Sequence, residues 1–217
     1  MPGAGKIDVR DLSPQLKDRT GASPYDAHYF YQDVWAAHQI AKRSPSRHVD
    51  VGSRIDYVGF VSVLTEVTFV DIRPLHVDLD RLKCVTGSIT ALPFDDGSIE
   101  SLSCLHVAEH VGLGRYGDEL DPEGTGRAAA ELQRVLALGG RLLFSVPVGR
   151  PRVCFNAHRI HDPVAVRRLF PELELASFAG VDDSGRFRTE LAPQDLRGAN
   201  YACGFFEFLR PAAGEDS

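Results

Sequence analysis

Short apolar runs alternate with amphipathic stretches along most of the chain, and this alternation limits the fold more than any other feature. Residues 25–42, 57–64 and 123–137 repeat apolar side chains every three or four positions, which predicts helices. Strands are predicted by the runs RHVDVGS, EVTFVDI, LKCVTGSI, IESLSCLHV and RLLFSVPV, which are rich in β-branched and small apolar residues. Strands that alternate with helices predict an α/β fold with a doubly wound, mostly parallel sheet.

The sequence also predicts an N-terminal arm and the elements of the C-terminal half of the chain. Residues 1–24 hold prolines, glycines and mixed charges without periodicity, so we expect an N-terminal arm before a single domain over residues 25–217. Gly139 and Gly140 are expected to end the helix over 123–137. DPVAVRRLF predicts a last helix because an aspartate cap and a proline precede the helical spacing. LELASFAGV and YACGFFEFL predict the closing strands.

Composition excludes several classes of protein. The 217 residues are 43% hydrophobic and 25% charged, which fits one globular domain. A net charge of −6 argues against a broad binding surface for nucleic acid or anionic membrane. No apolar run reaches the ~20 residues of a membrane span, and the first residues lack a secretion signal, so we expect a cytoplasmic protein. The four cysteines form no C-x-x-C pair, which predicts neither a zinc knuckle nor a redox motif.

In parallel sheets of this kind, ligands bind beyond the carboxyl ends of the strands, where the strand order reverses. After the first predicted strand, Gly52 allows a close approach of backbone to ligand. The second strand ends at Asp71, nineteen positions beyond Gly52, and a carboxylate about 20 residues after a glycine turn can bind ribose hydroxyls. The third strand leads to Ser88 and Ile89. These positions predict a site for a nucleoside cofactor.

The segment HVAEH, residues 106–110, allows a different interpretation. On a helix, His106 and His110 would share one face and bind zinc, with Glu109 activating water for hydrolysis. However, a strand-like run precedes the segment, and Gly112 and Gly114 follow it closely, so a helix of two turns has little room. We therefore predict no metal site, and the zinc hydrolase ranks last among the alternatives.

Four segments together resemble the signature segments of class I S-adenosylmethionine-dependent methyltransferases. They are HVDVGS, VTFVDI, GSITALPFDDGSIESLSCLHVAEHVGLG and ELQRVLALGGRLLFSVPV, and they run from about His48 to Val148. The resemblance implies a Rossmann-like fold with an antiparallel C-terminal strand, and S-adenosylmethionine as cofactor. GLGRYGD and GRPRVCFNAHRIHDP further resemble a group of short methyltransferase-like proteins, some of them associated with sugar and surface-polysaccharide synthesis.

The resemblance also assigns residues to the cofactor. It places Asp50, Gly52 and Ser53 near the methionine end, Asp71 on the ribose, and Ile89 on the adenine. Ser88 stands where many relatives have an aspartate that binds the adenine amino group. Ser53 and Ile55 replace two glycines of the usual Gly-x-Gly-x-Gly turn. The side chain of Ile55 either points away from the ligand or narrows its pocket, and the sequence leaves both alternatives open.

Transfer of a methyl group to a hydroxyl requires an aligned acceptor and a group that removes its proton. We predict His106, His110 and His158 as catalytic residues, with His161 a further candidate base and Asp118 a possible partner that orients one of them. Substrate-binding candidates are Glu109, Tyr116, Asn156 and Arg159. For Glu109 and His110 the alternative is a bridge within the loop, and for the segment FNAHRIHDP it is a helix-capping loop.

The leading functional prediction is a methyltransferase for a small polar acceptor, such as a sugar or a surface-polysaccharide precursor. The alternative is a fold relative that has lost catalysis and acts as a binding or scaffolding partner. A nicotinamide oxidoreductase is less favoured because the first turn lacks its glycine pattern. A small-molecule substrate is the expected partner, nucleic acid and a membrane span are not expected, and a homodimer remains an open alternative.

Overall fold

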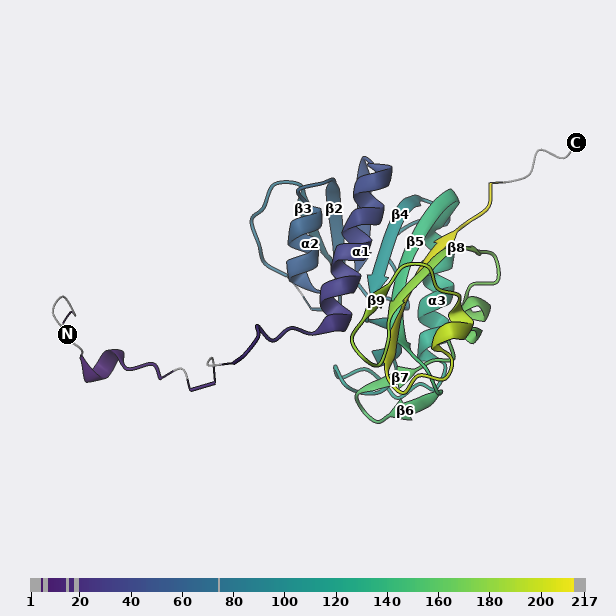
Figure 1. Ribbon diagram of the computed structural model, residues 1–217. Helices are drawn as coiled ribbons and strands as arrows, with labels where there is room; N and C mark the ends of the chain where they lie inside the picture. The colour runs from purple at the N-terminus through teal and green to yellow at the C-terminus, as the bar shows by residue number, and fades with distance from the viewer. Residues whose placement is uncertain (1–4, 6–7, 15, 18–19, 74, 213–217) are drawn as a thin grey trace, which may run out of the picture.

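A computed structural model describes residues 5, 8–14, 16–17, 20–73 and 75–212 of the chain. An eight-stranded sheet forms the centre of the molecule, and helices cover both of its faces (Figure 1). The described residues before the first long helix are exposed and extend away from this body (Figure 1). None of the helices in the described part of the chain has the length and apolar character needed to cross a membrane.

The elements follow one another in the predicted α/β order. The α-helices are α1 (Ala27–Arg43), α2 (Ile55–Val61) and α3 (Gly124–Val135). The strands are β1 (Arg47–Val51), β2 (Glu66–Asp71), β3 (Leu82–Thr86), β4 (Ile99–Leu105), β5 (Leu136–Val148), β6 (Arg152–Cys154), β7 (His158–Ile160), β8 (Glu174–Val181), β9 (Phe187–Arg188) and β10 (Ala202–Leu209). Short 3₁₀ helices cover Val9–Asp11, Ala108–His110, Ala165–Leu169 and Pro193–Leu196.

The main sheet has the order β3-β2-β1-β4-β5-β10-β8-β9. Strands β3, β2, β1, β4 and β5 are mutually parallel, and β10 pairs antiparallel with both β5 and β8. The predicted doubly wound sheet with an antiparallel C-terminal strand is therefore confirmed. The chain moves outward from β1 to β3 and then returns to β4 on the other side of β1. This reversal places the topological switch point between the carboxyl ends of β1 and β4.

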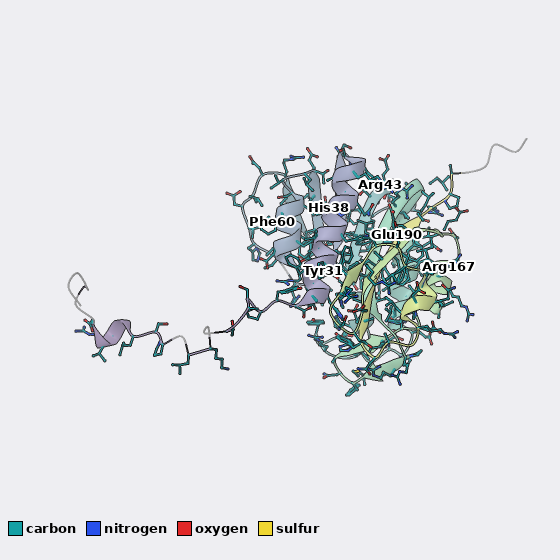
Figure 2. All side chains as sticks on the ribbon, viewed as in Figure 1. Tyr31, His38, Arg43, Phe60, Arg167 and Glu190 are labelled. Carbon is teal, nitrogen blue, oxygen red and sulfur yellow. The ribbon has the colours of Figure 1, made fainter. Side chains whose placement is uncertain are left out.

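Two apolar cores lie on the two faces of the sheet. On one face, Trp35 of α1 and Val58 of α2 pack with Phe205 of β10. On the other face, Leu132 of α3, Phe144 of β5 and Phe206 of β10 belong to one buried apolar cluster. Because side chains alternate along a strand, Phe205 and Phe206 enter opposite cores. Arg43 lies at the end of α1 (Figure 2). It forms an ion pair with the buried Glu207 of β10, which fixes this helix to the sheet.

Three sequence predictions of local structure were wrong. Gly139 and Gly140 lie inside β5 rather than at a helix end, and Gly139 has φ +75° where the pairing of β4 with β5 shifts register. The last predicted helix, residues 162–170, is only the 3₁₀ helix Ala165–Leu169. The segment that precedes it, expected as a loop, contains the hairpin of β6 and β7. This hairpin lies at the carboxyl end of β5 and therefore borders the region of the site (Figure 1).

Candidate functional site

A cavity opens at the carboxyl edge of the parallel strands. Its lining includes Gly52 after β1, Asp71 at the end of β2, Ser88 and Ile89 after β3, and His106 after β4. A second cavity adjoins it and shares Gly52, Asp71 and His106, and is bounded further by the first residues of α2 and by Tyr29 of α1. The strand ends that the sequence singled out therefore meet at one place.

The turn after β1 depends on glycine for two reasons. Gly52 has φ +71°, a conformation that side chains other than glycine adopt with strain. A Cβ atom built on Gly52 would also lie 3.0 Å from Cγ1 of Val107, the residue that follows His106. Gly52 thus lets the tip of β1 pack directly against the loop that follows β4.

Behind this turn lies a cluster of buried polar side chains, His48, Asp50, Ser53 and Ser103, which we call the closed cluster. Asp50 accepts hydrogen bonds from the backbone N–H of Ser53 at 3.0 Å, from Oγ of Ser53 at 2.7 Å, and from Oγ of Ser103. Oγ of Ser53 in turn accepts from the backbone N–H of Leu105 at 3.0 Å. His48 contacts Ser103 at 2.8 Å through Nε2. The closed cluster joins the turn after β1 to the end of β4.

Asp50, which the resemblance places near the methionine end of a cofactor, lies behind the turn. It is fully buried and lines neither cavity, and its carboxylate supports the turn. Burial raises its pKa to about 7, against the opposing effect of the hydrogen bonds from Ser103 and Ser53. Ser53 lines the second cavity, but its hydroxyl is directed to Asp50 and Leu105.

Asp71 lies at the edge of the first cavity with part of its side chain already engaged. Its Oδ1 accepts from the backbone N–H of Arg73 at 2.7 Å and from Nε of Arg73 at 3.3 Å. The guanidinium of Arg73 also lies over the ring of Tyr116, 5.1 Å from its centroid. Ser88 binds Thr90 through its hydroxyl at 2.9 Å, and Ile89 is buried in the cavity wall.

The loop that follows the 3₁₀ helix Ala108–His110 carries Tyr116 and Asp118 to the same cavity. Gly112, Gly114 and Gly117 all have positive φ, as a tight loop requires. Asp118 accepts hydrogen bonds from the backbone N–H groups of Gly112 at 2.6 Å and Tyr116 at 3.2 Å. The carboxylate of Asp118 therefore holds the loop, and it orients no histidine.

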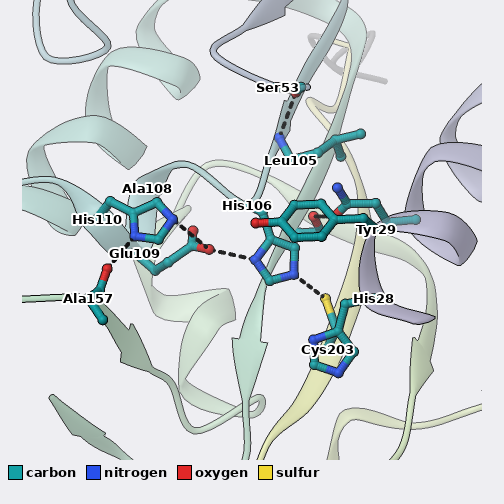
Figure 3. A network of polar contacts seen from close by, with 12 residues as sticks. His28, Tyr29, Ser53, Leu105, His106, Ala108, Glu109, His110, Ala157 and Cys203 are labelled. Carbon is teal, nitrogen blue, oxygen red and sulfur yellow. Dashed lines mark hydrogen bonds and ion pairs between the residues drawn. The ribbon is translucent and has the colours of Figure 1, made fainter. Parts of the chain in front are cut away.

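A second buried polar cluster reaches the cavity wall (Figure 3). We call it the open cluster; it contains His28, His106, Glu109 and Cys203. His106 Nδ1 contacts Oε1 of Glu109 at 2.6 Å, and His106 Nε2 contacts Sγ of Cys203 at 3.1 Å. The rings of His28 and His106 are stacked, with centroids 5.9 Å apart. His106 itself has φ +57°, in the left-handed region that residues other than glycine adopt with strain.

Charge is shared unevenly in the open cluster. Burial alone would lower the pKa of His106, but Cys203 and Glu109 outweigh it and hold the pKa well above the ordinary value. Burial would raise the pKa of Glu109, and the contact with His106 reverses this and lowers it. Oε2 of Glu109 is buried without a hydrogen-bond partner; within the described residues, only His161 Nε2 shares this property. An unpaired buried oxygen of this kind requires an explanation.

His110 does not share a helical face with His106. Its Nδ1 contacts the backbone carbonyl of Ala157 at 2.6 Å, and its Nε2 lies 3.7 Å from Oε1 of Glu109. The segment between the two histidines forms only a 3₁₀ helix of three residues. The helical zinc motif therefore does not form, as the sequence analysis predicted. His110 lines both cavities and bridges the loop to the β6–β7 hairpin.

Five residues that the sequence predicted for substrate binding or catalysis line neither cavity: Glu109, Asn156, His158, Arg159 and His161. Asn156 is exposed in the turn between β6 and β7. Arg159 donates to the backbone carbonyls of Val111 and Asp121, so its guanidinium stabilises the loop and is not available to a substrate. His158 lines neither cavity and lies behind His110, with ring centroids 6.5 Å apart. The alternative of a structural loop therefore describes Arg159 in this structure.

Other residues of the site were not predicted from the sequence. His28 and Tyr29 come from the first turn of α1, where Asp26 accepts from both of their backbone N–H groups. Cys203 comes from β10, 97 positions from His106. The cap at Asp26 is a local signal that could have located the start of α1. No local signal places Cys203 beside His106, since their contact depends on the order of the strands.

Comparisons with known proteins agree with this description. The family described as Caenorhabditis protein of unknown function, DUF268, matches residues 96–200, just under half of the chain. The matched segment contains His106, Glu109 and His110 but ends before Cys203 and begins after Gly52 and Asp71. No curated protein matched the sequence.

Several solved structures have the same architecture. YcgJ from Bacillus subtilis has a TM-score of 0.59 and 11% identity, over 85% of this chain and 100% of YcgJ. The N-methyltransferase NodS from Bradyrhizobium japonicum, solved with S-adenosylhomocysteine, has a TM-score of 0.55 and 12% identity, over 84% of this chain and 88% of NodS. The fold is that of the class I S-adenosylmethionine-dependent methyltransferases.

A methyltransferase fold does not by itself name a reaction. The [4+2]-cyclase SpnF matches with a TM-score of 0.58 and 14% identity, over 83% of this chain and 82% of SpnF. The function must therefore be argued from the cavity and its side chains.

Proposed function

We propose that this protein is an S-adenosylmethionine-dependent methyltransferase that modifies a small polar acceptor. One observation carries the proposal: Gly52, Asp71, Ser88 and Ile89 line a single cavity at the carboxyl edge of the parallel strands. This is the edge at which open α/β sheets bind nucleotides, beside the point where the strand order reverses.

In this proposal the adenosine of the cofactor lies at the ends of β2 and β3. Arg73 already binds Oδ1 of Asp71, so we assign Oδ2 to the ribose hydroxyls. The apolar wall at Ile89 accommodates the adenine ring, and Ser88 offers a hydroxyl to the edge of the base. The methionine part then passes Gly52, whose lack of a side chain permits a close approach.

The two lost glycines of the first turn do not argue against this placement. The hydroxyl of Ser53 faces inward to Asp50. The side chain of Ile55 is 57% exposed at the start of α2 and borders the second cavity. Neither residue lines the first cavity, so the replacements leave the proposed adenosine site open.

The second cavity is the proposed site of the acceptor. Its lining combines Tyr29, Arg54, Asp56, His110 and Tyr116, a set rich in hydrogen-bonding and charged groups. Such a lining favours a small polar acceptor over an apolar one. A sugar or a surface-polysaccharide precursor is consistent with this chemistry.

His110 is the residue that we assign to proton removal. Its Nδ1 is held by the carbonyl of Ala157, and Glu109 lies near enough to its Nε2 to stabilise a proton there. Methyl transfer is an in-line displacement in which the protein aligns the acceptor and accepts its proton. Replacement His110→Gln is expected to slow transfer by roughly 10²- to 10⁴-fold.

Calorimetry with S-adenosylhomocysteine tests the proposal before any acceptor is known. We expect micromolar binding, and a loss of roughly 10- to 100-fold in Asp71→Asn, because a charged hydrogen-bond acceptor contributes about 1.5–3 kcal/mol. Asp78→Asn is the matched control, since Asp78 is exposed and lines neither cavity. A folded protein that binds nothing at millimolar ligand would favour the alternative, a fold relative that acts as a scaffolding partner.

A further inference from the structure

Three side chains from distant parts of the sequence converge beside the cavity. His28 lies in the first turn of α1, His106 follows β4, and Cys203 lies near the start of β10 (Figure 3). One ligand atom from each, two imidazole nitrogens and one thiol sulfur, lies within 4.8 Å of the others. Cys203 Sγ and His106 Nε2 are 3.1 Å apart.

We propose that His28, His106 and Cys203 bind a zinc ion. A thiolate with two imidazoles is a donor set that zinc prefers, whereas magnesium and calcium require oxygen ligands. Tetrahedral zinc with bonds of about 2.0–2.3 Å places its ligand atoms roughly 3.3–3.8 Å apart. Cys203 Sγ and His106 Nε2 are 3.1 Å apart, and all three ligand atoms lie within 4.8 Å of one another, so the ligands need to shift by about an ångström to surround the ion.

The surroundings of His106 match those of a zinc ligand. A metal-bound histidine usually donates its second ring N–H to a carboxylate, which fixes the tautomer and directs the other nitrogen at the metal. In this structure Glu109 Oε1 contacts Nδ1 of His106 at 2.6 Å, and Nε2 faces Cys203. Glu109 is fully buried and therefore holds the ring in this orientation.

The other two ligands are also held in position. The backbone N–H of His28 donates to Oδ1 of Asp26, which fixes the first turn of α1. Cys203 is fully buried in β10 between β5 and β8, so its backbone is held by strand pairing on both sides. A preformed site of this kind lowers the entropy lost when the metal binds.

Charge is balanced when the site is filled. Binding displaces two protons, one from the thiol of Cys203 and one from Nε2 of His106, and both are released to solvent. The two positive charges of zinc are then matched by the thiolate of Cys203 and the carboxylate of Glu109. The buried carboxylate of Glu109 gains a cation nearby, which helps to account for an acidic group so fully removed from water.

Three protein ligands leave one position of tetrahedral zinc unfilled, which is the arrangement of sites that bind water or substrate. His106 lines both cavities, so this position lies at the boundary of the proposed acceptor site. The idea that the metal contacts an oxygen of the methyl acceptor depends on the proposed function. The proposal that the three side chains bind zinc does not depend on it.

Cobalt binding followed by absorption spectroscopy tests the site directly. Metal-free protein titrated with Co²⁺ should saturate at one equivalent and show a thiolate-to-cobalt charge-transfer band with tetrahedral d–d bands. Cys203→Ser should abolish the charge-transfer band, and His28→Gln should weaken cobalt binding. Two matched controls, Cys84→Ser and the exposed His38→Gln, should leave the spectrum unchanged (Figure 2).

Glu109→Gln provides a variant that keeps all three ligands. Loss of the charged partner of His106 should weaken metal binding by roughly 10- to 100-fold while the charge-transfer band persists at saturation. The proposal is overturned if folded wild-type protein shows no such band, or if Cys203→Ser retains it. Calorimetry with S-adenosylhomocysteine separates the two proposals, since Asp71→Asn should impair that binding and leave the cobalt spectrum intact.

Discussion

The closed cluster and the open cluster lie at the same edge of the sheet and are both buried, but they differ in how completely their polar atoms are paired. Each carboxylate oxygen of Asp50 accepts a hydrogen bond from a neighbouring residue. In the open cluster, Oε2 of Glu109 has no hydrogen-bond partner, and His106 reaches the cavity wall.

This difference separates two uses of buried polarity. A cluster whose atoms are all paired stabilises the fold and has no capacity left for a ligand. A cluster with an unpaired atom and access to a cavity is a candidate for binding. We therefore expect mutations in the closed cluster to change stability, and mutations in the open cluster to change ligand binding.

The largest expected effect concerns Asp50 and pH. Burial raises the pKa of Asp50 from 3.8 to about 7, so the folded state retains a proton that the unfolded state releases. Its contribution to stability is full below pH ~4, falls as pH rises, and is lost above pH ~7. The free energy of unfolding of Asp50→Asn relative to wild type should therefore rise by on the order of 3 kcal/mol between pH 4 and pH 8.

Urea denaturation at a series of pH values measures this difference. Other buried titratable groups lie nearby and contribute to the pH dependence of both proteins. Their contributions cancel in the difference between wild type and Asp50→Asn; these groups are His48, Asp33, Tyr57 and Cys104. A difference that stays constant across this range would contradict the assignment of a buried, protonated Asp50.

The second prediction restores the glycine that the related turn usually has. Ser53→Gly removes the hydrogen bonds of Ser53 Oγ to Asp50 and to the backbone N–H of Leu105. We expect a loss of about 2 kcal/mol in the free energy of unfolding, since each hydrogen bond contributes about 1 kcal/mol. Affinity for S-adenosylhomocysteine should stay within about twofold in calorimetry. A large loss of affinity would show that Ser53 contacts the ligand.

Gly52 lies between the two clusters, and Gly52→Ala tests how closely they must approach. The alanine would have a positive φ and a Cβ 3.0 Å from Val107, so we expect a loss of about 1–2 kcal/mol and weaker binding of S-adenosylhomocysteine. Gly59→Ala in α2 is the control, because a Cβ there meets no atom within 4 Å. That control should stabilise the protein by about 0.5–1 kcal/mol, and equal effects at both glycines would refute the argument.

The smallest effect on stability is expected in the open cluster. Glu109→Gln keeps an acceptor for His106 Nδ1–H, and without the carboxylate the ring of His106 gives up its second proton, so the buried pair becomes neutral instead of leaving an unpaired charge. We expect the free energy of unfolding to change by less than about 1 kcal/mol in thermal or urea denaturation. If Glu109→Gln lowered the free energy of unfolding as much as Ser53→Gly does, Glu109 would be a structural residue, and the two clusters would not differ in the way described.

The sequence predicted the strand ends well because they depend on local patterns. The apolar runs that end at Gly52, Asp71 and His106 each form a strand, and parallel pairing brings their carboxyl ends together. The predicted positions of these residues therefore followed from chain order alone, while their roles toward a cofactor stay predictions.

The residues that sequence reasoning misplaced depend on tertiary contacts. Arg159 was expected in a loop after the fifth predicted strand, but it lies inside β7, and its guanidinium donates to the backbone carbonyls of Val111 and Asp121. Asp50 occupies the position of a ligand-binding residue, yet Ser103 of β4 pairs with it from behind. Cys203 has no motif around it and gains its neighbours only because β10 pairs with β5.

The most direct test of the account is a crystal structure with S-adenosylhomocysteine. The account predicts density in the first cavity, with the ribose hydroxyls within hydrogen-bond distance of Asp71 and the adenine against Ile89. An empty cavity in crystals soaked at millimolar ligand, or a nucleoside bound away from Gly52 and Asp71, would contradict it.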